Sequence, residues 1–253
     1  MTSGALAGHI GTSRQFGFER LSIQVDGHQG YLLKPADFML NRSNPWVWYA
    51  PHFSGDGPPW PPSIHEWTFV RVLQAGIAVC GVDVGESWGS PTGRRGFTLF
   101  HRAMVKGFGL NPRARLLGQS RGALYHYNWA ADHPECVDRL AQIYPVCDLS
   151  RAPVSFDRLA EAYGMSAAGL QEQLSAHNPI ERLAPLVAAG IPIFHVHGDA
   201  DAVVPLAQHS TELARRYQAL GGEIELLVVH GQGHEEVDAF FKCQALVDFL
   251  TRE

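Results

Sequence analysis

Eight short segments of the chain carry patterns of hydrophobic and polar residues that are typical of β-strands. The first two, 20–25 and 30–35, flank Asp26-Gly27, a dipeptide that favours a tight turn, and they predict an antiparallel hairpin. The other six are mostly apolar runs, which indicate strands buried on both faces of a parallel sheet. These runs lie at residues 46–50, 77–84, 114–117, 140–147, 191–197 and 223–229.

Segments with helical patterns lie between these strands, at residues 64–75, 98–106, 123–131, 180–189, 206–220 and 236–250. The alternation of strands and helices favours an α/β fold, with a mostly parallel, twisted sheet of about eight strands and helices on both faces. Residues 149–178 interrupt the alternation and predict a small, cap-like helical insertion. Residues 1–17 are small and polar, and we expect them to form a loose N-terminal arm. The sequence contains no linker, so we expect one domain over residues 1–253.

The charge of the chain argues against several classes of partner. The net charge of −5 at pH 7 comes without any basic run, which disfavours nucleic acid and anionic membrane surfaces as partners. The N-terminal sequence lacks the basic and apolar parts of a signal peptide, and no apolar run approaches the roughly 20 residues of a membrane span. Unless a signal peptide has been removed, we expect a cytoplasmic protein that acts on a small molecule. The oligomeric state is left open.

The pattern Gly-x-Ser-x-Gly occurs at residues 118–122, where a predicted strand ends and a predicted helix begins. A sharp turn from strand to helix strains its central residue and leaves no room for flanking side chains, which accounts for the two glycines. Ser120 would then stand exposed at the start of the helix. A second match at residues 85–89 centres on Ser87, but the sequence Ser-Pro-Thr-Gly at 90–93 follows it and is typical of a turn. We therefore predict that Ser120 is a nucleophile and that Ser87 is a loop residue near the site.

A serine hydroxyl becomes nucleophilic only when a base takes its proton and a third group orients that base. Asp201 and His234 follow two later strands of the predicted sheet, and the carboxyl ends of parallel strands share one edge. The three side chains can therefore converge, with His234 as general base and then acid and with Asp201 orienting it. The order Ser120, Asp201, His234 along the chain is the order found in α/β-hydrolases.

On these motifs the chain resembles the α/β-hydrolase superfamily, in particular its compact esterase, dienelactone-hydrolase-like and peptidase-S9-like branch. Three motifs carry the resemblance: the nucleophile elbow at 118–122, the acid turn Gly-Asp-Ala-Asp-Ala-Val-Val-Pro at 198–205, and the histidine loop Gly-Gln-Gly-His at 231–234. The resemblance runs from about Leu21 to the C-terminus. Three motifs in the correct order and spacing are far more specific than any one of them.

Other residues compete for some of these roles. The resemblance implies that Asp201 is the acid and that Asp199 orders the turn before it. Asp148 stays an alternative, because some hydrolases of this fold resemble a pattern in which the acid follows the preceding strand. His195 and His197 lie two apart on one strand and face the same way, as two metal ligands would. No third ligand accompanies them in the sequence, so we expect them to be core residues and expect no metal.

Hydrolysis through an acyl-enzyme also needs backbone donors where the oxyanion develops. By the resemblance, the N–H of Arg121, directly after the nucleophile, is the first donor. The second is expected in the loop after the strand 46–50, at Phe53 or at Ser54. Here the chain has His52-Phe53 where the family usually has His-Gly, and Phe53 is therefore also a candidate wall of the acyl pocket.

Several further side chains are candidates for contact with the substrate. Glucuronoyl esterases, which this elbow also resembles, carry an arginine after the nucleophile, so the Arg121 side chain is expected either to bind a uronate or sugar hydroxyl or to support the elbow through a salt bridge. Ser54, Trp60 and Trp88 are expected near the substrate pocket, where the indoles would stack on a sugar or an aromatic acid. His52, His65 and His101 are further candidates for the pocket wall, but we expect them to be solvated loop or helix residues instead.

The resemblance implies a serine carboxylesterase that forms an acyl-enzyme on Ser120 and requires no cofactor. Because the insertion is too small to form a large lid, short-acyl or carbohydrate-linked esters are the expected substrates. The fold also hosts lyases, cofactor-free haloperoxidases, small peptidases and binding proteins without catalysis. The presence of all three triad residues disfavours a binding protein. A peptidase is disfavoured because no propeller or gating domain accompanies these residues.

Overall fold

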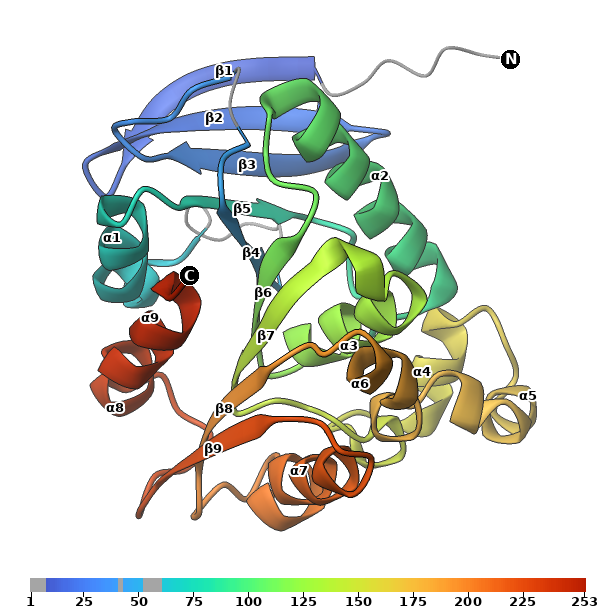
Figure 1. Ribbon diagram of the computed structural model, residues 1–253. Helices are drawn as coiled ribbons and strands as arrows, with labels where there is room; N and C mark the ends of the chain where they lie inside the picture. Colours follow the sequence, from blue (N-terminus) through green and yellow to red (C-terminus); the bar gives the residue numbers. More distant parts are fainter. Residues whose placement is uncertain (1–7, 41–42, 52–60) are drawn as a thin grey trace.

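The structure, a computed structural model, describes residues 8–40, 43–51 and 61–253 (Figure 1). Its centre is a nine-stranded sheet with the strand order β1-β2-β3-β5-β4-β6-β7-β8-β9. All neighbours from β5 to β9 are parallel, whereas β1, β2, β3 and β5 pair antiparallel. The strands are β1 (Gly8–Gln15), β2 (Phe18–Val25), β3 (His28–Lys34), β4 (Trp46–Ala50), β5 (Ala78–Val82), β6 (Ala114–Gln119), β7 (Val137–Ile143), β8 (Ile193–Gly198) and β9 (Ile224–Val229). The predicted α/β fold with a mostly parallel sheet is confirmed.

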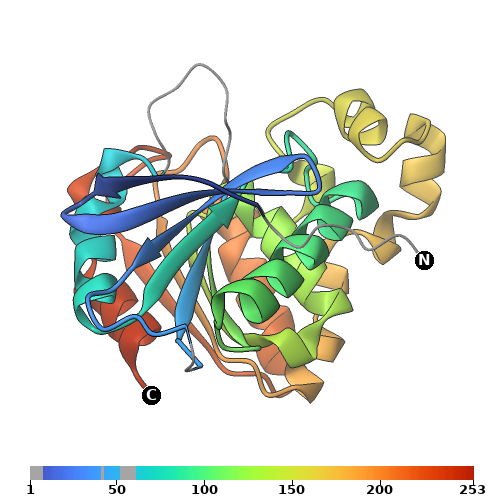
Figure 2. The same cartoon turned by 90° about the horizontal axis from the view of Figure 1, so that it is seen from above.

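Helices cover both faces of this sheet (Figures 1 and 2). One face carries α1 (Glu66–Gln74), α8 (Asp238–Phe241) and α9 (Gln244–Thr251), and the other carries α2 (Pro91–Phe108), α3 (Gly122–Asp132), α6 (Ala184–Ala188) and α7 (Ser210–Ala219). Each face has its own core: Trp48 of β4 packs into the α2 and α3 side and its neighbour Val47 into the α1 and α9 side. Both side chains are fully buried, as expected for a strand enclosed on both faces.

The N-terminal segment differs from the expected loose arm. Residues 8–15 form strand β1, which pairs antiparallel with β2 at the edge of the sheet. Most side chains of β1 are exposed, so the strand has no hydrophobic pattern, and its order comes from backbone hydrogen bonds to β2. Phe16 and Gly17 connect the two strands with φ values of 53° and 82°, the pair of positive φ angles of a tight hairpin turn. The sheet therefore has nine strands instead of about eight.

The second helix also begins earlier than expected. Ser90 and Pro91 were expected to belong to a turn, but α2 starts at Pro91 and Ser90 is its N-cap, with Oγ accepting a hydrogen bond from the Gly93 N–H. Proline is well tolerated at the first helical position because its missing N–H has no partner there in any case. Gly109 ends the helix in the left-handed conformation at φ 67°. A helix therefore does follow Ser87, and the argument against Ser87 as the nucleophile that relied on the absence of this helix was wrong. The predicted position of Ser87 in a loop is correct, since it lies between β5 and α2.

The insertion expected at 149–178 consists of short helices that pack beside the carboxyl end of the sheet. It contains α4 (Phe156–Ala162) and α5 (Ala167–Glu172). Leu159 and Leu170 pack with Leu124 of α3 and with Val204 after β8 in a third hydrophobic cluster. The six single-turn 3₁₀ helices of the described residues are η1 (Ser63–His65), η2 (Pro134–Cys136), η3 (Leu149–Arg151), η4 (Leu174–Ala176), η5 (Pro179–Glu181) and η6 (Leu206–Gln208).

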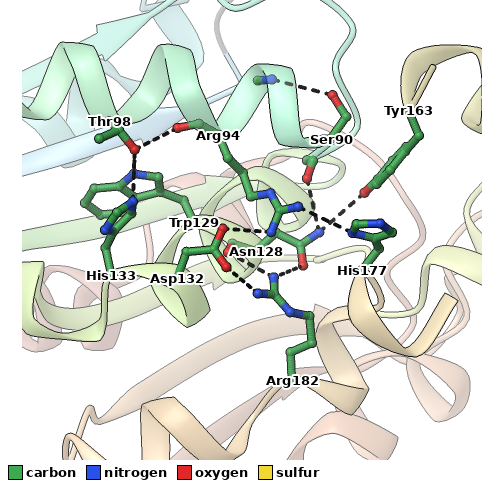
Figure 3. Close-up of polar contacts among 12 residues, drawn as sticks. Ser90, Arg94, Thr98, Asn128, Trp129, Asp132, His133, Tyr163, His177 and Arg182 are labelled. Carbon is green, nitrogen blue, oxygen red and sulfur yellow. Dashed lines mark hydrogen bonds and ion pairs between the residues drawn. The ribbon is translucent and has the colours of Figure 1, made fainter. Parts of the chain in front are cut away.

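A network of charged and polar side chains joins the end of the insertion to α2 and α3 (Figure 3). Asp132 of α3 binds both Arg94 of α2, at 2.7 Å, and Arg182. Arg94 Nη2 lies 3.4 Å from Nδ1 of His177 at the end of the insertion, and Arg182 Nη1 donates to Oδ1 of Asn128 at 2.9 Å. Arg94 is 9% exposed, but the side chain of Asp132 is partly exposed, so solvent screens this ion pair in part. The network holds the insertion against α3, the helix that follows Ser120.

Within the described ranges, no helix is long and apolar enough to cross a membrane.

Four buried histidines make stability depend on pH. Burial lowers the pKa of His126 and His195 to about 3 and that of His65 and His209 to about 4. In the unfolded chain these rings titrate near about pH 6.5, so below that pH the unfolded state binds more protons than the folded state. We expect the free energy of unfolding, measured by urea titration, to fall as the pH is lowered from about 6.5 to 4.

His126 provides a direct test of this dependence. Both ring nitrogens of His126 are buried without a hydrogen-bond partner among the described residues, and the ring packs against Trp48 and Phe97. We expect His126→Phe to raise the free energy of unfolding by about 1 to 3 kcal/mol at pH 7 and to flatten its decline at acidic pH. His65→Phe is the matched control, since His65 hydrogen-bonds Tyr49; it should destabilise the protein instead. If the free energy of unfolding of His126→Phe fell at acidic pH as steeply as that of the natural sequence, His126 would not contribute to the pH dependence.

Candidate active site

The turn between β6 and α3 presents Ser120 at the carboxyl edge of the sheet. Ser120 has φ 51°, a left-handed conformation that costs a non-glycine residue about 1 to 2 kcal/mol. Backbone hydrogen bonds hold it there: its N–H donates to the Ile143 carbonyl at 2.9 Å, and its carbonyl accepts from Val146 N–H at 3.0 Å and from Ala123 N–H at 3.1 Å. The predicted sequence of strand, sharp turn and helix is therefore present around Ser120, and β7 fixes the strained residue.

The two glycines of this turn are required by close backbone and side-chain contacts. A Cβ atom on Gly122 would lie 2.2 Å from the carbonyl oxygen of Ala50, and one on Gly118 would lie 2.0 Å from Oε1 of Gln142. Real Cβ atoms do not approach other atoms so closely. Gly122 is the more restrictive position because its neighbour is backbone of the central strand β4.

Ser120, His234 and Asp201 meet although they are far apart in the sequence. Ser120 Oγ lies 2.9 Å from His234 Nε2, and His234 Nδ1 lies 2.7 Å from Oδ2 of Asp201. Asp201 follows β8 and His234 follows β9, two neighbouring parallel strands, so both lie at the edge that Ser120 occupies. His234 donates through Nδ1 to the carboxylate, which leaves Nε2 free to accept the serine proton.

The carboxylate of Asp201 is buried and fully hydrogen-bonded. Burial opposes its ionisation, but hydrogen bonds from His197, His234 and the Val204 N–H outweigh burial and hold the pKa of Asp201 well below its usual range. Oδ1 accepts from the N–H groups of Val203 and Val204 at 2.9 and 2.7 Å, and Oδ2 accepts from the two histidines. Asp201 is thus an anion at neutral pH, oriented toward His234.

The competing acids have other partners. Asp199 accepts from His230 Nδ1 at 2.7 Å and from Gly231 N–H at 2.7 Å, and so joins the acid turn to the histidine loop. Asp148 caps η3 by accepting from Ser150 N–H, and it also accepts from Asn178. Both residues therefore order loops, and the contact with His234 belongs to Asp201.

A cavity of about 430 Å³ opens beside Ser120. Its described walls include four residues that the motifs do not reveal: Tyr49, Gln119, Tyr144 and Glu236. Gln119 connects the other three, because its Oε1 accepts from the Tyr49 hydroxyl at 2.8 Å while its Nε2 donates to Tyr144 and Glu236 at 2.7 and 3.1 Å. Only its position inside the Gly-x-Ser-x-Gly pattern could have indicated Gln119. The wall is therefore polar and internally hydrogen-bonded.

Other candidate residues of the sequence lie elsewhere or outside the described ranges. Phe53, Ser54 and Trp60 fall in the part of the chain that the structure does not describe, so the second oxyanion donor and these pocket residues stay predictions. Trp88 is not among the described residues that line the cavity; its ring lies 5.8 Å from the guanidinium of Arg121.

The side chain of Arg121, the residue after Ser120, forms an ion pair with Glu86. Nη2 of Arg121 lies 3.1 Å from Oε1 of Glu86. Of the two roles expected for this arginine, the pairing fits support of the elbow. The backbone of Arg121 is the N-cap of α3, so its N–H lies at the positive end of that helix dipole.

His195, His197 and His65 are all fully buried. For the first two this agrees with the expected core position, and both bind Ser210 Oγ, at 2.9 and 2.8 Å. His65 was expected to be solvated, but its Nε2 lies 2.9 Å from the Tyr49 hydroxyl and its ring stacks on Phe69. Among the described residues, no group of three or more His, Cys, Asp or Glu side chains could hold a metal ion.

The fold, with its Ser-His-Asp arrangement at the carboxyl edge of the sheet, is that of the α/β-hydrolase class. The sequence model of the prolyl oligopeptidase family, peptidase S9, matches residues 100–252. The chain belongs to this family.

Solved structures share the fold at low sequence identity. Dipeptidyl peptidase 4 of Porphyromonas gingivalis superposes with a TM-score of 0.70 at 15% identity over 92% of this chain, but over 35% of its own. Est1E of Butyrivibrio proteoclasticus (TM-score 0.68, 15% identity) and an S-formylglutathione hydrolase of Agrobacterium tumefaciens (TM-score 0.69, 13% identity) are covered over 97% and 95% of their chains, and they cover 91% and 96% of this one. The chain thus spans about a third of the peptidase and nearly all of the two hydrolases. No curated protein sequence matches it.

The packing at the elbow gives a testable prediction. We expect Gly122→Ala to lower the free energy of unfolding by about 1 to 3 kcal/mol, because its Cβ would press against the Ala50 carbonyl, and to slow the labelling of Ser120 by a fluorophosphonate. Gly107→Ala in α2 is the matched control, since nothing lies within 4 Å of its Cβ position; we expect it to stabilise by about 0.5 to 1 kcal/mol. Equal effects of the two substitutions in urea unfolding would contradict the close contact at Gly122.

Proposed function

We propose that this protein is a carboxylesterase that forms an acyl-enzyme on Ser120. The observation that carries the proposal is the continuous series of hydrogen bonds from Ser120 Oγ through His234 to the buried Asp201 carboxylate. Such a series supplies a base for the serine proton and an anion that stabilises the imidazolium formed when the base takes it.

In the proposed reaction, Ser120 Oγ attacks the carbonyl carbon of the ester as His234 Nε2 takes the hydroxyl proton. The tetrahedral oxyanion is bound by the backbone N–H of Arg121 and by a second donor, for which Phe53 is the candidate. His234 then gives its proton to the leaving alcohol, and the acyl group stays on Ser120. Water, activated by His234, attacks the acyl-enzyme and releases the carboxylic acid, which restores the serine hydroxyl.

Small esters with polar groups are the proposed substrates. The cavity of about 430 Å³ is suited to a short acyl chain, and its wall of Gln119, Tyr144 and Glu236 offers hydrogen-bonding groups to a hydroxyl-rich alcohol such as a sugar. The insertion adds only short helices beside the site. These features favour short-acyl or carbohydrate-linked esters over long triglycerides.

A peptidase is the second candidate, because the family and the first of the structural neighbours carry that name. The same residues would serve both reactions, since an amide also passes through an acyl-enzyme. The two candidates differ in the leaving group, which is an alkoxide in one and an amine in the other. Only measured turnover of matched substrates separates them.

The first test is intact-mass analysis after treatment with a fluorophosphonate. We expect one adduct on the natural sequence, no adduct on Ser120→Ala, and a normal adduct on Ser87→Ala, which is the matched control at the rival motif. Asp201→Asn should label about 10²- to 10⁴-fold more slowly, because His234 would lose the anion that fixes its tautomer. An adduct that survives Ser120→Ala would refute the proposed nucleophile.

The second test compares esters and amides of the same acyl group. We expect kcat/KM to be highest for p-nitrophenyl acetate or butyrate and for acetylated sugars, and lower for p-nitrophenyl laurate, since the cavity is small. Turnover of a dipeptidyl p-nitroanilide at a rate that matches the acetate would favour the peptidase instead.

A further inference from the structure

A chain of buried hydrogen bonds continues inward from the carboxylate of Asp201. His197 Nε2 lies 3.2 Å from Asp201 Oδ2 and 2.8 Å from the Val204 carbonyl oxygen. His197 Nδ1 lies 2.8 Å from Ser210 Oγ, which lies 2.9 Å from Nδ1 of His195. The next ring nitrogen, His195 Nε2, lies 2.6 Å from the hydroxyl of Tyr127. The chain joins α3, β8 and α7, and each of its side chains is at most 1% exposed.

The acceptors of this chain fix the direction of its protons. A backbone carbonyl only accepts, so His197 Nε2 carries a hydrogen and donates it to Val204 and Asp201. A neutral His197 then accepts at Nδ1 from the Ser210 hydroxyl. Ser210 Oγ in turn accepts from His195 Nδ1, which leaves His195 Nε2 to accept from Tyr127. Every donor in this arrangement points toward Asp201.

The reverse direction is disfavoured. It would need a hydrogen on both nitrogens of His197. The Tyr127 hydroxyl would then accept from His195, and its own buried proton would have no acceptor among the described residues. A buried donor without an acceptor destabilises the folded state. Burial also lowers the pKa of His195 to about 3, with a smaller contribution from His197, so His195 is neutral at physiological pH and has one hydrogen to give.

We propose that His197 is a positioning residue of the triad, which holds Oδ2 of Asp201 against His234, and that Ser210 and His195 fix the tautomer of His197 in which it can do so. This inference rests on the proposed function, since it assigns a role in the same site. Without the Nε2 hydrogen, His197 would turn a lone pair toward two oxygen atoms, and the Asp201 carboxylate would lose one of its four donors.

The proposal has a consequence for the pH profile. A carboxylate that receives fewer hydrogen bonds keeps more of its charge for the neighbouring imidazole and stabilises the imidazolium better. Loss of the His197 donor should therefore move the acidic limb of the profile, where the base becomes protonated, to higher pH. A substitution that only loosens the fold would lower stability without this shift.

Other titratable groups around the site do not produce the same signature. His209 Nδ1 accepts from the N–H groups of Cys147 and Asp148, and burial lowers its pKa to about 4. Burial raises the pKa of Tyr144, whose ring lies 4.4 Å from that of His234, and also that of Tyr127. These groups are neutral between about pH 5 and 9. The charged groups that complete the surroundings are Asp148 and Arg151 beside His209, and Glu236 beside Tyr144.

The test measures the rate at which a fluorophosphonate labels Ser120, as a function of pH, in the full chain. For His197→Leu and Ser210→Ala we expect labelling to slow about 10- to 100-fold and the acidic limb to move up by about half a pH unit, because the anion is less well held. His197→Gln should restore most of the rate, since its side-chain N–H₂ can reach the place of Nε2.

Ser90→Ala is the matched control for destabilisation. Ser90 is nearly as buried as Ser210 and caps α2. The loss of its hydroxyl should therefore destabilise the fold without changing the hydrogen bonds between Tyr127 and Asp201. The proposal is overturned if His197→Leu and Ser210→Ala label with the rate and pH profile of the natural sequence, or if Ser90→Ala reproduces their shift. Should His197→Leu fail to fold, Ser210→Ala decides by the same criteria.

Labelling also separates this inference from the proposed function. The reaction reports on the nucleophile and needs no natural substrate. If the natural sequence is not labelled on Ser120, the proposed function fails and the role of His197 fails with it. If the natural sequence is labelled and the variants behave like it, only the positioning role is refuted.

Discussion

The structure around the candidate site depends on keeping one carboxylate, that of Asp201, ionised in a place that water does not reach. Burial of such an anion costs several kcal/mol unless donors replace its hydration. Here two backbone N–H groups and two histidines supply the replacement, and both backbone donors come from the turn that Asp201 itself begins. The anion therefore orders its own loop, and that ordered loop brings Val204 into the hydrophobic cluster of the insertion. The hydrogen bonds that stabilise the Asp201 carboxylate thus also position Val204 in the hydrophobic core.

The geometry of the sheet brings Ser120, Asp201 and His234 together. Strands β6, β8 and β9 are parallel and nearly adjacent, so the three residues of the site need only lie just past the ends of their strands to meet. The strained φ of Ser120 is held by hydrogen bonds to Ile143 and Val146, on both sides of the end of β7. The end of β7, which carries none of the three residues of the site, therefore fixes the backbone of Ser120. The core strands are mostly apolar, and the three residues of the site lie in the turns and loops that follow them.

The sequence predicted those residues of the site that lie in short motifs. It did not predict the residues whose place depends on how strands and loops are aligned in the folded protein. Ser120, Asp201 and His234 each sit in a short pattern with its own steric or hydrogen-bonding reason, and the common edge of a parallel sheet brings those patterns together. Tyr144 and Glu236 have no such pattern, because their place on the cavity wall follows from how β7 and the last loop are positioned. The same distinction applies to the fold. Buried strands are recognisable as mostly apolar runs, whereas β1 is an exposed edge strand that is ordered by backbone pairing with β2. The dipeptide Ser-Pro at 90–91 is equally typical of a turn and of the start of a helix.

The buried histidines of the core differ in whether their ring nitrogens have hydrogen-bond partners. An apolar side chain would pack at least as well as a hydrogen-bonded one and would avoid the cost of desolvation. His126 has no compensating partner among the described residues, and nothing in the structure explains it. His195 and His197 differ, because every polar atom of their rings has a partner and the chain they form ends on the carboxylate of Asp201. A fully satisfied network of this kind allows one arrangement of its members and no other. This single arrangement keeps Asp201 Oδ2 against Nδ1 of His234, whose Nε2 lies beside Ser120 Oγ.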